Sequence, residues 1–128
     1  MTDSLVSAAR AAQAQAYAPY SRYRVGAALE AEDGRVFVGC NVENASYGLT
    51  ICAERAAVCA AVAAGARRFR RAVVVTDSDP PAAPCGACRQ VLAEFGPDLQ
   101  VVGVGPAATV SWTMRDLLPA AFRKEQLQ

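Results

Sequence analysis

Two short segments hold residues whose types and spacing could bind a metal and activate water. One is residues 52–55, Cys-Ala-Glu-Arg, and the other is residues 84–90, which contain the pair Cys85 and Cys88. Residues three apart in a first helical turn share a face, so the two sulfurs of the pair can point to one place. A helix N-terminus also stabilises thiolate. If both segments begin neighbouring helices at one sheet edge, Cys52, Cys85 and Cys88 converge on one metal ion.

Three thiolate ligands predict a zinc ion with water at the fourth position, which is typical of a catalytic rather than a structural site. Two other cysteines must then be explained. Cys59 lies seven residues after Cys52, about 10 Å along a helix, which is too far for a shared metal. Cys40 ends a predicted strand, and spacing alone leaves open that it is a fourth ligand. For both, a buried free thiol is the commoner role.

A carboxylate and a guanidinium accompany the first candidate ligand. Glu54 could lean over the open position and move protons between water and a substrate, which is general acid–base catalysis. The alternative role for Glu54 is structural, because a negative charge in the first turn of a helix interacts favourably with the helix dipole. Three thiolates leave zinc with a net negative charge, so we expect Arg55 to donate to a ligand sulfur. Gln90, two residues after Cys88, is a further candidate for such support around the ligands.

Composition narrows the class of protein. The chain has 128 residues, 13 Lys+Arg against 12 Asp+Glu, and 53% hydrophobic residues, which predicts one folded domain over residues 1–128 rather than disorder. A charge near zero argues against a nucleic-acid partner, and we interpret the basic run 67–71 as a solvated edge. Histidine is absent, which excludes Ser-His and Cys-His nucleophile pairs and histidine zinc sites.

The cellular setting follows from the cysteines and the apolar runs. Five cysteines are an odd number for a disulfide framework, so we expect a reduced, cytoplasmic protein. Residues 1–4 do not begin a secretory signal, and apolar runs are too short for a membrane span. We therefore expect no membrane association.

The elements that must position these residues can be read from periodicity and turn signals. They are, in chain order, a helix over 4–17 ended by Pro19, strands over 25–32 and 35–41, a loop to 50, a helix over 51–66, a strand over 72–76, a loop to 83, a helix over 84–95, strands over 99–104 and 110–112, and a helix to 118 capped by Thr113. Asp33-Gly34 predicts a hairpin, and the apolar run 72–76 predicts a strand in mid-sheet. This order indicates a helix-covered mixed sheet in three layers.

Residues 52–54 together with 84–88 match the zinc signature of the nucleobase deaminases in its three-cysteine form. The whole chain resembles the small three-cysteine cytidine deaminases of pyrimidine salvage. The matching stretches are residues 17–21, 25–29, 39–47, 52–55, 84–91 and 117–119, together with Phe122.

The resemblance implies an α/β protein with a three-layer α-β-α fold around a mixed five-stranded sheet, one Zn²⁺ per chain, and hydrolysis of cytidine and 2′-deoxycytidine to uridine and 2′-deoxyuridine. Asn41 and Glu43 of this chain match the two residues that, in the family, bind the ribose 3′-hydroxyl. The Ala53 backbone N–H and the Ala83 carbonyl match positions that contact the base and the departing amine. Tyr23 lines the pocket where the family more often has Phe.

The resemblance also implies a homotetramer with shared active sites. Phe122 matches an aromatic residue that, in the family, contacts the base bound in a neighbouring subunit. Ala45 and Tyr47 match positions that also contribute to a neighbouring subunit's site. Arg123 follows Phe122, where the family usually has Gly. For Tyr20 and Phe95 we prefer ordinary core packing.

The sequence is compatible with three functions. The first is cytidine deamination, and the second is the same chemistry on an aminoacyl-nucleoside antibiotic, as in the related blasticidin deaminases. Those relatives lack the acid at Glu43, which favours the nucleoside. The third is a non-enzymatic zinc module or a Cys-x-x-Cys redox protein, but a zinc ribbon needs two such pairs and a redox motif leaves Glu54 unexplained. Editing of a polynucleotide would need a basic groove, which the neutral charge disfavours.

Overall fold

A mixed five-stranded sheet forms the middle layer of the protein in the computed structural model, which describes residues 2–127. Its strands are β1 (Gly26–Ala31), β2 (Val36–Cys40), β3 (Phe69–Val75), β4 (Gln100–Val104) and β5 (Thr109–Thr113). They lie in the order β2-β1-β3-β4-β5. Only β3 and β4 pair in parallel, and the other neighbours are antiparallel. The predicted mixed sheet is confirmed.

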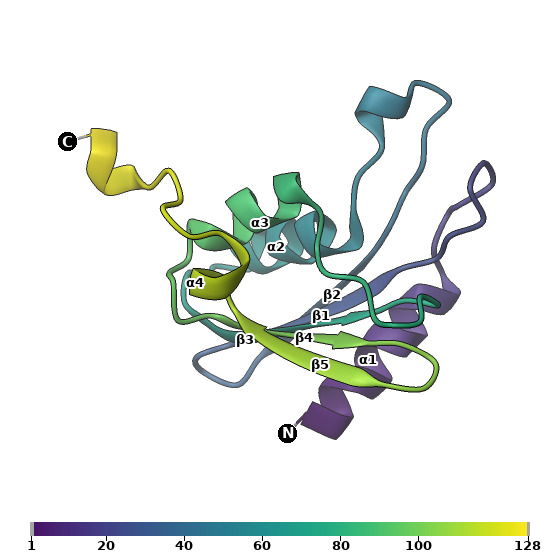
Figure 1. The fold of residues 1–128 in the computed structure, drawn as a ribbon, viewed down its shortest axis with the longest axis horizontal. Coiled ribbons are helices and arrows are strands. Elements are labelled where there is room, and N and C mark those ends of the chain that lie inside the picture. The colour runs from purple at the N-terminus through teal and green to yellow at the C-terminus, as the bar shows by residue number, and fades with distance from the viewer. Residues whose placement is uncertain (1, 128) are drawn as a thin grey trace.

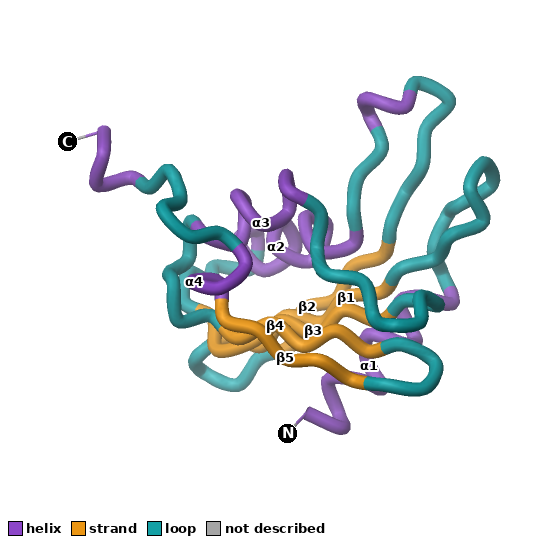
Figure 2. The backbone as a smooth tube through the Cα atoms, in the orientation of Figure 1, coloured by secondary structure: helices purple, strands orange, loops and turns teal. Residues whose placement is uncertain are grey.

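Helices cover both faces of this sheet (Figure 1). The helix α1 (Thr2–Ala14) lies on one face, and α2 (Ala53–Ala63), α3 (Gly86–Ala93) and the short α4 (Met114–Leu117) lie on the other. Two 3₁₀ turns, η1 (Tyr47–Leu49) and η2 (Lys124–Leu127), sit in segments that extend away from the sheet (Figure 2). The three-layer prediction is therefore confirmed, and within residues 2–127 no helix is long and apolar enough to cross a membrane.

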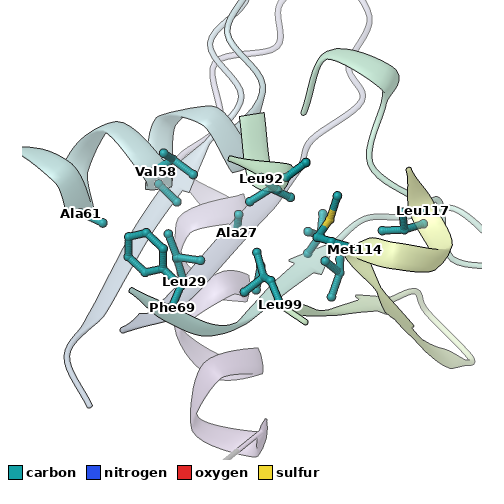
Figure 3. Packing of buried hydrophobic residues seen from close by; sticks show 14 of the residues in the cluster. Ala27, Leu29, Val58, Ala61, Phe69, Leu92, Leu99, Met114 and Leu117 are labelled. Atoms are coloured by element: carbon teal, nitrogen blue, oxygen red, sulfur yellow. The ribbon is translucent and has the colours of Figure 1, made fainter. Parts of the chain in front are cut away.

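Each face of the sheet has its own hydrophobic core. On the α2 and α3 side, Leu29, Leu92 and Met114 are about 1% exposed and pack in one cluster (Figure 3). On the α1 side, Val73 and Val75 of β3 pack with Leu5. Since alternate residues of β3 enter opposite cores, a continuous apolar run is required there. This places β3 in mid-sheet, as predicted.

Glycine lets α2 approach the sheet closely. A β-carbon on Gly39 of β2 would lie 2.5 Å from both the carbonyl oxygen of Ala53 and the backbone nitrogen of Ala57. Real side-chain atoms do not tolerate such a distance. The first turn of α2 therefore rests directly on the backbone of β2, and this contact fixes where that turn begins.

Several helix boundaries differ from the sequence-based expectation: α2 ends at Ala63 rather than at residue 66, and α3 spans Gly86–Ala93 rather than 84–95. The helix α1 ends at Ala14 rather than at residue 17. The backbone N–H of Tyr17 donates to Asn41 (3.0 Å), and the Glu43 N–H donates to Tyr17 (2.8 Å). This bridge uses backbone groups that a longer helix would need, so tertiary pairing and not Pro19 ends the helix. The helix α2 starts after Cys52, which is its extended N-cap, rather than at residue 51.

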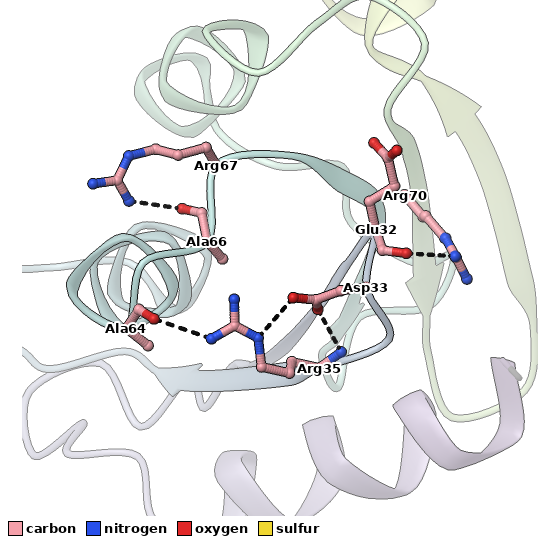
Figure 4. Close-up of polar contacts among 7 residues, drawn as sticks. All are labelled: Glu32, Asp33, Arg35, Ala64, Ala66, Arg67 and Arg70. Carbon is pink, nitrogen blue, oxygen red and sulfur yellow. Dashed lines mark hydrogen bonds and ion pairs between the residues drawn. The ribbon is translucent and has the colours of Figure 1, made fainter.

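The basic run beside the hairpin makes intramolecular contacts (Figure 4). Gly34 has φ 95° in the turn, as the predicted Asp-Gly hairpin requires. Arg35 pairs with Asp33 and donates to the carbonyl of Ala64 (3.0 Å), and Arg67 donates to the carbonyl of Ala66 (3.0 Å). Both arginines satisfy carbonyls at and just beyond the C-terminal end of α2. Residues 69–71, however, begin the mid-sheet strand β3, and Phe69 is buried in a hydrophobic core, so the interpretation of the whole run as a solvated edge is wrong.

Candidate functional site

Three cysteine sulfurs meet at the starts of two helices. Cys52 is the N-cap of α2 and Cys85 is the N-cap of α3, and both have extended backbones. Cys88 lies one turn into α3 and is buried. The three Sγ atoms lie within 4.8 Å of one another. The convergence predicted from the spacing is present.

The spacing of these sulfurs fits zinc. Sulfurs bound tetrahedrally at about 2.3 Å from the ion lie about 3.8 Å apart. The Sγ atoms of Cys52 and Cys85 are 3.8 Å apart. Among residues 2–127 this is the one such cluster, and it includes neither Cys40 nor Cys59. Cys59 is exposed on α2, so the expectation of a buried thiol is wrong for it, whereas Cys40 is half-buried.

Arg55 compensates negative charge at the sulfurs. Its Nη2 lies 3.3 Å from the Cys52 Sγ, and the same atom lies 3.4 Å from the Thr50 carbonyl oxygen. A hydrogen bond from the Cys88 thiol, followed by one from Arg55, lowers the pKa of Cys52 to about 5. The same contact with Cys52, together with burial, raises the pKa of Cys88. A lowered pKa favours the thiolate of Cys52, the form in which cysteine binds a metal.

Glu54 supplies a buried carboxyl group beside the sulfurs. It is 6% exposed. Burial raises the pKa of Glu54, and the negative charge of Cys52 raises it further. A raised pKa brings a carboxyl group closer to the range in which it can both accept and return a proton. This is the property that proton transfer to and from a substrate needs.

A cavity of about 230 Å³ opens onto these groups. Its lining comprises Tyr23, Val25, Asn41, Thr50, Cys52, Ala53, Glu54, Val74, Thr76, Ala82, Ala83 and Cys85. Five residues predicted to contact substrate or move protons are among them, namely Tyr23, Asn41, Ala53, Glu54 and Ala83. The cavity therefore brings the proton-transfer group, two sulfurs and much of the predicted pocket together.

Asn41 supports one wall of this cavity. Its Oδ1 accepts a hydrogen bond from the backbone N–H of Val25 (2.9 Å), and its Nδ2 donates to the carbonyl of Tyr23 (2.7 Å). An amide carries two N–H donors, so one donor beyond the Tyr23 contact is available to a ligand. Asn41 is thus both a structural tie and a candidate binding group.

Glu43 lies in an adjoining cavity of about 440 Å³ that shares Thr50 with the first. Its carboxylate accepts from the backbone N–H groups of Tyr20 (2.9 Å) and Ser21 (3.2 Å), and from the Ser21 hydroxyl. The Ser21 hydroxyl is the main reason that the pKa of Glu43 is lowered. The structure therefore places Asn41 in the first cavity and Glu43 next to it.

The remaining predicted residues lie outside the first cavity. Tyr47 borders the adjoining cavity and is 78% exposed. Phe122 is 58% exposed, Ala45 is also exposed, and neither lines either cavity. Gln90 donates to the Phe122 carbonyl (2.8 Å), so its side chain holds the C-terminal segment and makes no contact with sulfur that the structure records.

The two aromatic residues expected in the core behave differently. Phe95 packs edge-on against Phe69 with ring centroids 4.9 Å apart, in agreement with the expectation. Tyr20 is 52% exposed and meets the ring of Tyr47 edge-on at 6.5 Å. Core packing is wrong for Tyr20, because it lies in the loop between α1 and β1 and its ring joins neither hydrophobic core.

Sequence reasoning missed several cavity residues. Thr50 borders both cavities, and Thr76 lies in the first directly after β3. A polar residue at the carboxyl end of a buried strand is where ligands gather in α/β sheets, so Thr76 carried a usable signal. Thr50, which ends a loop, carried none.

Comparisons with known proteins agree with this site. The family model for the cytidine and deoxycytidylate deaminase zinc-binding region matches residues 1–104. A cytidine deaminase of Sporosarcina psychrophila is 46% identical over 127 residues, which cover 98% of this chain and 93% of that protein. A crystal structure of cytidine deaminase from Burkholderia pseudomallei is 52% identical with a TM-score of 0.92, covering 95% and 99% of the two chains. A blasticidin-S deaminase of Bacillus cereus is 27% identical over 112 residues, covering 81% of this chain and 80% of that protein.

Proposed function

Because the chain belongs to the cytidine and deoxycytidylate deaminase family, we propose that it hydrolyses cytidine and 2′-deoxycytidine to uridine and 2′-deoxyuridine with release of ammonia. One observation carries this conclusion. The buried carboxyl group of Glu54 borders the same cavity as the Cys52 and Cys85 sulfurs. That cavity also offers backbone groups and an aromatic wall for a planar base.

Cys52, Cys85 and Cys88 hold one zinc ion per chain in this proposal. When bound, the ion acts as a Lewis acid that activates water for attack on C4 of the pyrimidine. Arg55 stays hydrogen-bonded to the Cys52 sulfur and offsets part of the negative charge of the three thiolates. Gln90 helps indirectly, by holding the C-terminal segment beside α3.

Glu54 moves the protons. Its carboxylate takes a proton from the attacking water and delivers it to ring N3. It then transfers the second water proton to the 4-amino group, which leaves as ammonia. Glu54 ends as it began, so the overall balance is substrate and water in, and the uridine product and ammonia out. The raised pKa of Glu54 suits both transfers.

The remaining cavity residues bind and orient the nucleoside. The Ala53 N–H and the Ala83 carbonyl contact the base and its amino group, and Tyr23 covers the ring. Asn41 donates its free amide hydrogen to the ribose 3′-hydroxyl. Glu43 accepts from the same hydroxyl, because each carboxylate oxygen can accept more than one hydrogen bond.

Exposed apolar side chains support assembly of the whole enzyme. Tyr47, Leu49 and Phe122 are 78%, 65% and 58% exposed, in two segments that extend from the sheet (Figure 1). Apolar groups gathered on such projections are typical of interfaces. We propose a homotetramer in which Ala45, Tyr47 and Phe122 reach a neighbouring site, acting in cytoplasmic pyrimidine salvage.

Zinc content and turnover test this function together. Purified protein should hold one zinc ion per chain and should lower the ultraviolet absorbance of cytidine and 2′-deoxycytidine. Replacing Cys52, Cys85 or Cys88 by Ser should remove the zinc, whereas Cys59→Ser should keep it. Turnover of an aminoacyl-nucleoside antibiotic in preference to cytidine would contradict the substrate assignment. Unchanged zinc in all three cysteine variants would contradict the metal site.

A further inference from the structure

The side chains of Tyr23 and Ser78 link two loops that both contribute residues to the cavity. The Tyr23 hydroxyl and the Ser78 Oγ are 2.6 Å apart, although the residues are 55 positions apart in the chain. Tyr23 follows α1 and lines the cavity. Ser78 lies between β3 and α3, in the same segment as Ala83 and Cys85. This pair has no part in the proton transfers described above.

The Tyr23 end of the pair is firmly held. Its backbone N–H donates to the Ser21 hydroxyl (3.0 Å), and its carbonyl accepts from Asn41 (2.7 Å). The preceding Arg22 has φ 61°, a left-handed conformation that residues other than glycine seldom adopt. Strained backbone of this kind persists where the surroundings over-determine it, and it gathers at functional sites.

The Ser78 end is also anchored. The backbone N–H of Ser78 donates to Oγ1 of Thr76 (3.2 Å), which lines the cavity. The carbonyl of Ser78 lies so close to buried Gly105 that a β-carbon there would collide with it. The Tyr23–Ser78 contact thus links the start of the 77–83 segment to the loop that carries Tyr23.

We propose that the Tyr23–Ser78 hydrogen bond is a clasp that holds the segment carrying Ala83 at a set distance from the aromatic wall. Tyr23 is then a positioning residue through its hydroxyl, in addition to covering the base with its ring. The proposal rests on the proposed function only for its effect on the substrate. Without the clasp, nucleoside binding must order residues 77–83 itself, which weakens binding more than it slows chemistry.

The test compares Tyr23→Phe, Ser78→Ala and the double variant in the zinc-loaded enzyme. Each single change should raise KM for cytidine about threefold to tenfold, the effect of one hydrogen bond, with kcat altered by less than about twofold. The double variant should match the single variants, because either change removes the same bond. Tyr17→Phe and Ser111→Ala, at exposed sites outside the cavity, are the matched controls. The clasp would be refuted if the increase in KM of the double variant equalled the product of the two single increases. An unchanged KM in the single variants would also refute it.

Hydrogen exchange of the substrate-free protein separates this inference from the function on which it rests. Tyr23→Phe and Ser78→Ala should both speed exchange of the residue-78 amide, which donates to Oγ1 of Thr76, and the controls should not. Gly105→Ala, which displaces the Ser78 carbonyl, should reproduce the change without touching either hydroxyl. If the wild-type protein fails to deaminate cytidine, the proposed function is wrong, but the hydrogen-exchange comparison still tests the clasp. Exchange that stays at the wild-type rate in both hydroxyl variants would refute the clasp even in an active enzyme.

Discussion

Glu54 shows how one residue obtains its chemistry from its neighbours. In the first turn of α2 a glutamate is ordinarily a solvated acid that complements the helix dipole. Here it is 6% exposed and lies two residues after Cys52 in the chain. Burial and the Cys52 charge raise its pKa, so this carboxyl group holds a proton more readily than a solvated glutamate does.

Glu54→Gln should leave the fold and the zinc content unchanged while kcat falls about a hundredfold to ten-thousandfold. The amide keeps the size of the side chain but can neither accept nor return a proton. Steady-state kinetics with cytidine, beside metal analysis and a thermal melt of the same preparation, measures all three. Turnover close to that of the wild type would remove Glu54 from the mechanism.

The hydrogen bonds of the Glu43 carboxylate predict how the stability of the fold depends on pH. The Ser21 hydroxyl, with the backbone N–H groups of Ser21 and Tyr20, holds the pKa of Glu43 below the ordinary value of 4.5. A lowered pKa in the folded state means that the ionised group stabilises the fold above its unfolded pKa. That contribution is lost as the pH falls through the lower folded pKa.

Glu43→Gln should therefore melt below the wild type at about pH 7, and the difference should shrink towards about pH 3. Thermal melts of both proteins across this range, with zinc content recorded at each pH, measure the effect. A difference in Tm that stays constant with pH would show that the carboxylate charge does not matter.

At the scale of elements, the site depends on how α2 meets β2. The first turn of α2 carries Glu54 and follows Cys52, and it rests on Gly39 with no room for a side chain. The sheet thereby sets the position of a ligand and of the proton-transfer group together. The second helix, α3, brings Cys85 and Cys88 to the same point.

Gly39→Ala should destabilise the protein by about 1–3 kcal/mol, the usual cost of overpacking, and should lower the zinc retained after dialysis. The added methyl group must push the first turn of α2 away from the sheet and from α3. Gly48→Ala, where a β-carbon meets open space, is the control and should retain zinc normally. Full zinc retention by Gly39→Ala would show that this contact does not position the ligands.

Features set by local sequence could be predicted, and features set by distant contacts could not. The cysteine spacing and the Asp33-Gly34 turn each depend on a few neighbouring residues, so their patterns were sufficient. The end of α1 depends on Tyr17 pairing with Asn41, which no local pattern reveals. The same holds for the Tyr23–Ser78 contact and for the place of Glu43 in an adjoining cavity.

At the scale of the whole molecule, a single chain exposes several apolar side chains to solvent. The segment around η1 and the C-terminal segment extend from the three layers (Figure 2), and they carry Leu49 and Phe122 in exposed positions. Neither side chain belongs to either hydrophobic core. Covering such groups with a second copy of the chain would remove apolar area from water and so favour association.

Leu49→Asp should therefore lower the native mass from that of the proposed tetramer, because a charge placed in an apolar interface loses hydration without gaining a partner. Zinc should be retained, since Leu49 lies outside both cavities. Activity should fall with the mass if neighbouring chains complete each site. Sedimentation, metal analysis and cytidine turnover measure the three quantities. Ser7→Asp, on an exposed position of α1, adds the same charge and should change none of them. A wild-type protein that sediments as a monomer with full activity would refute shared active sites.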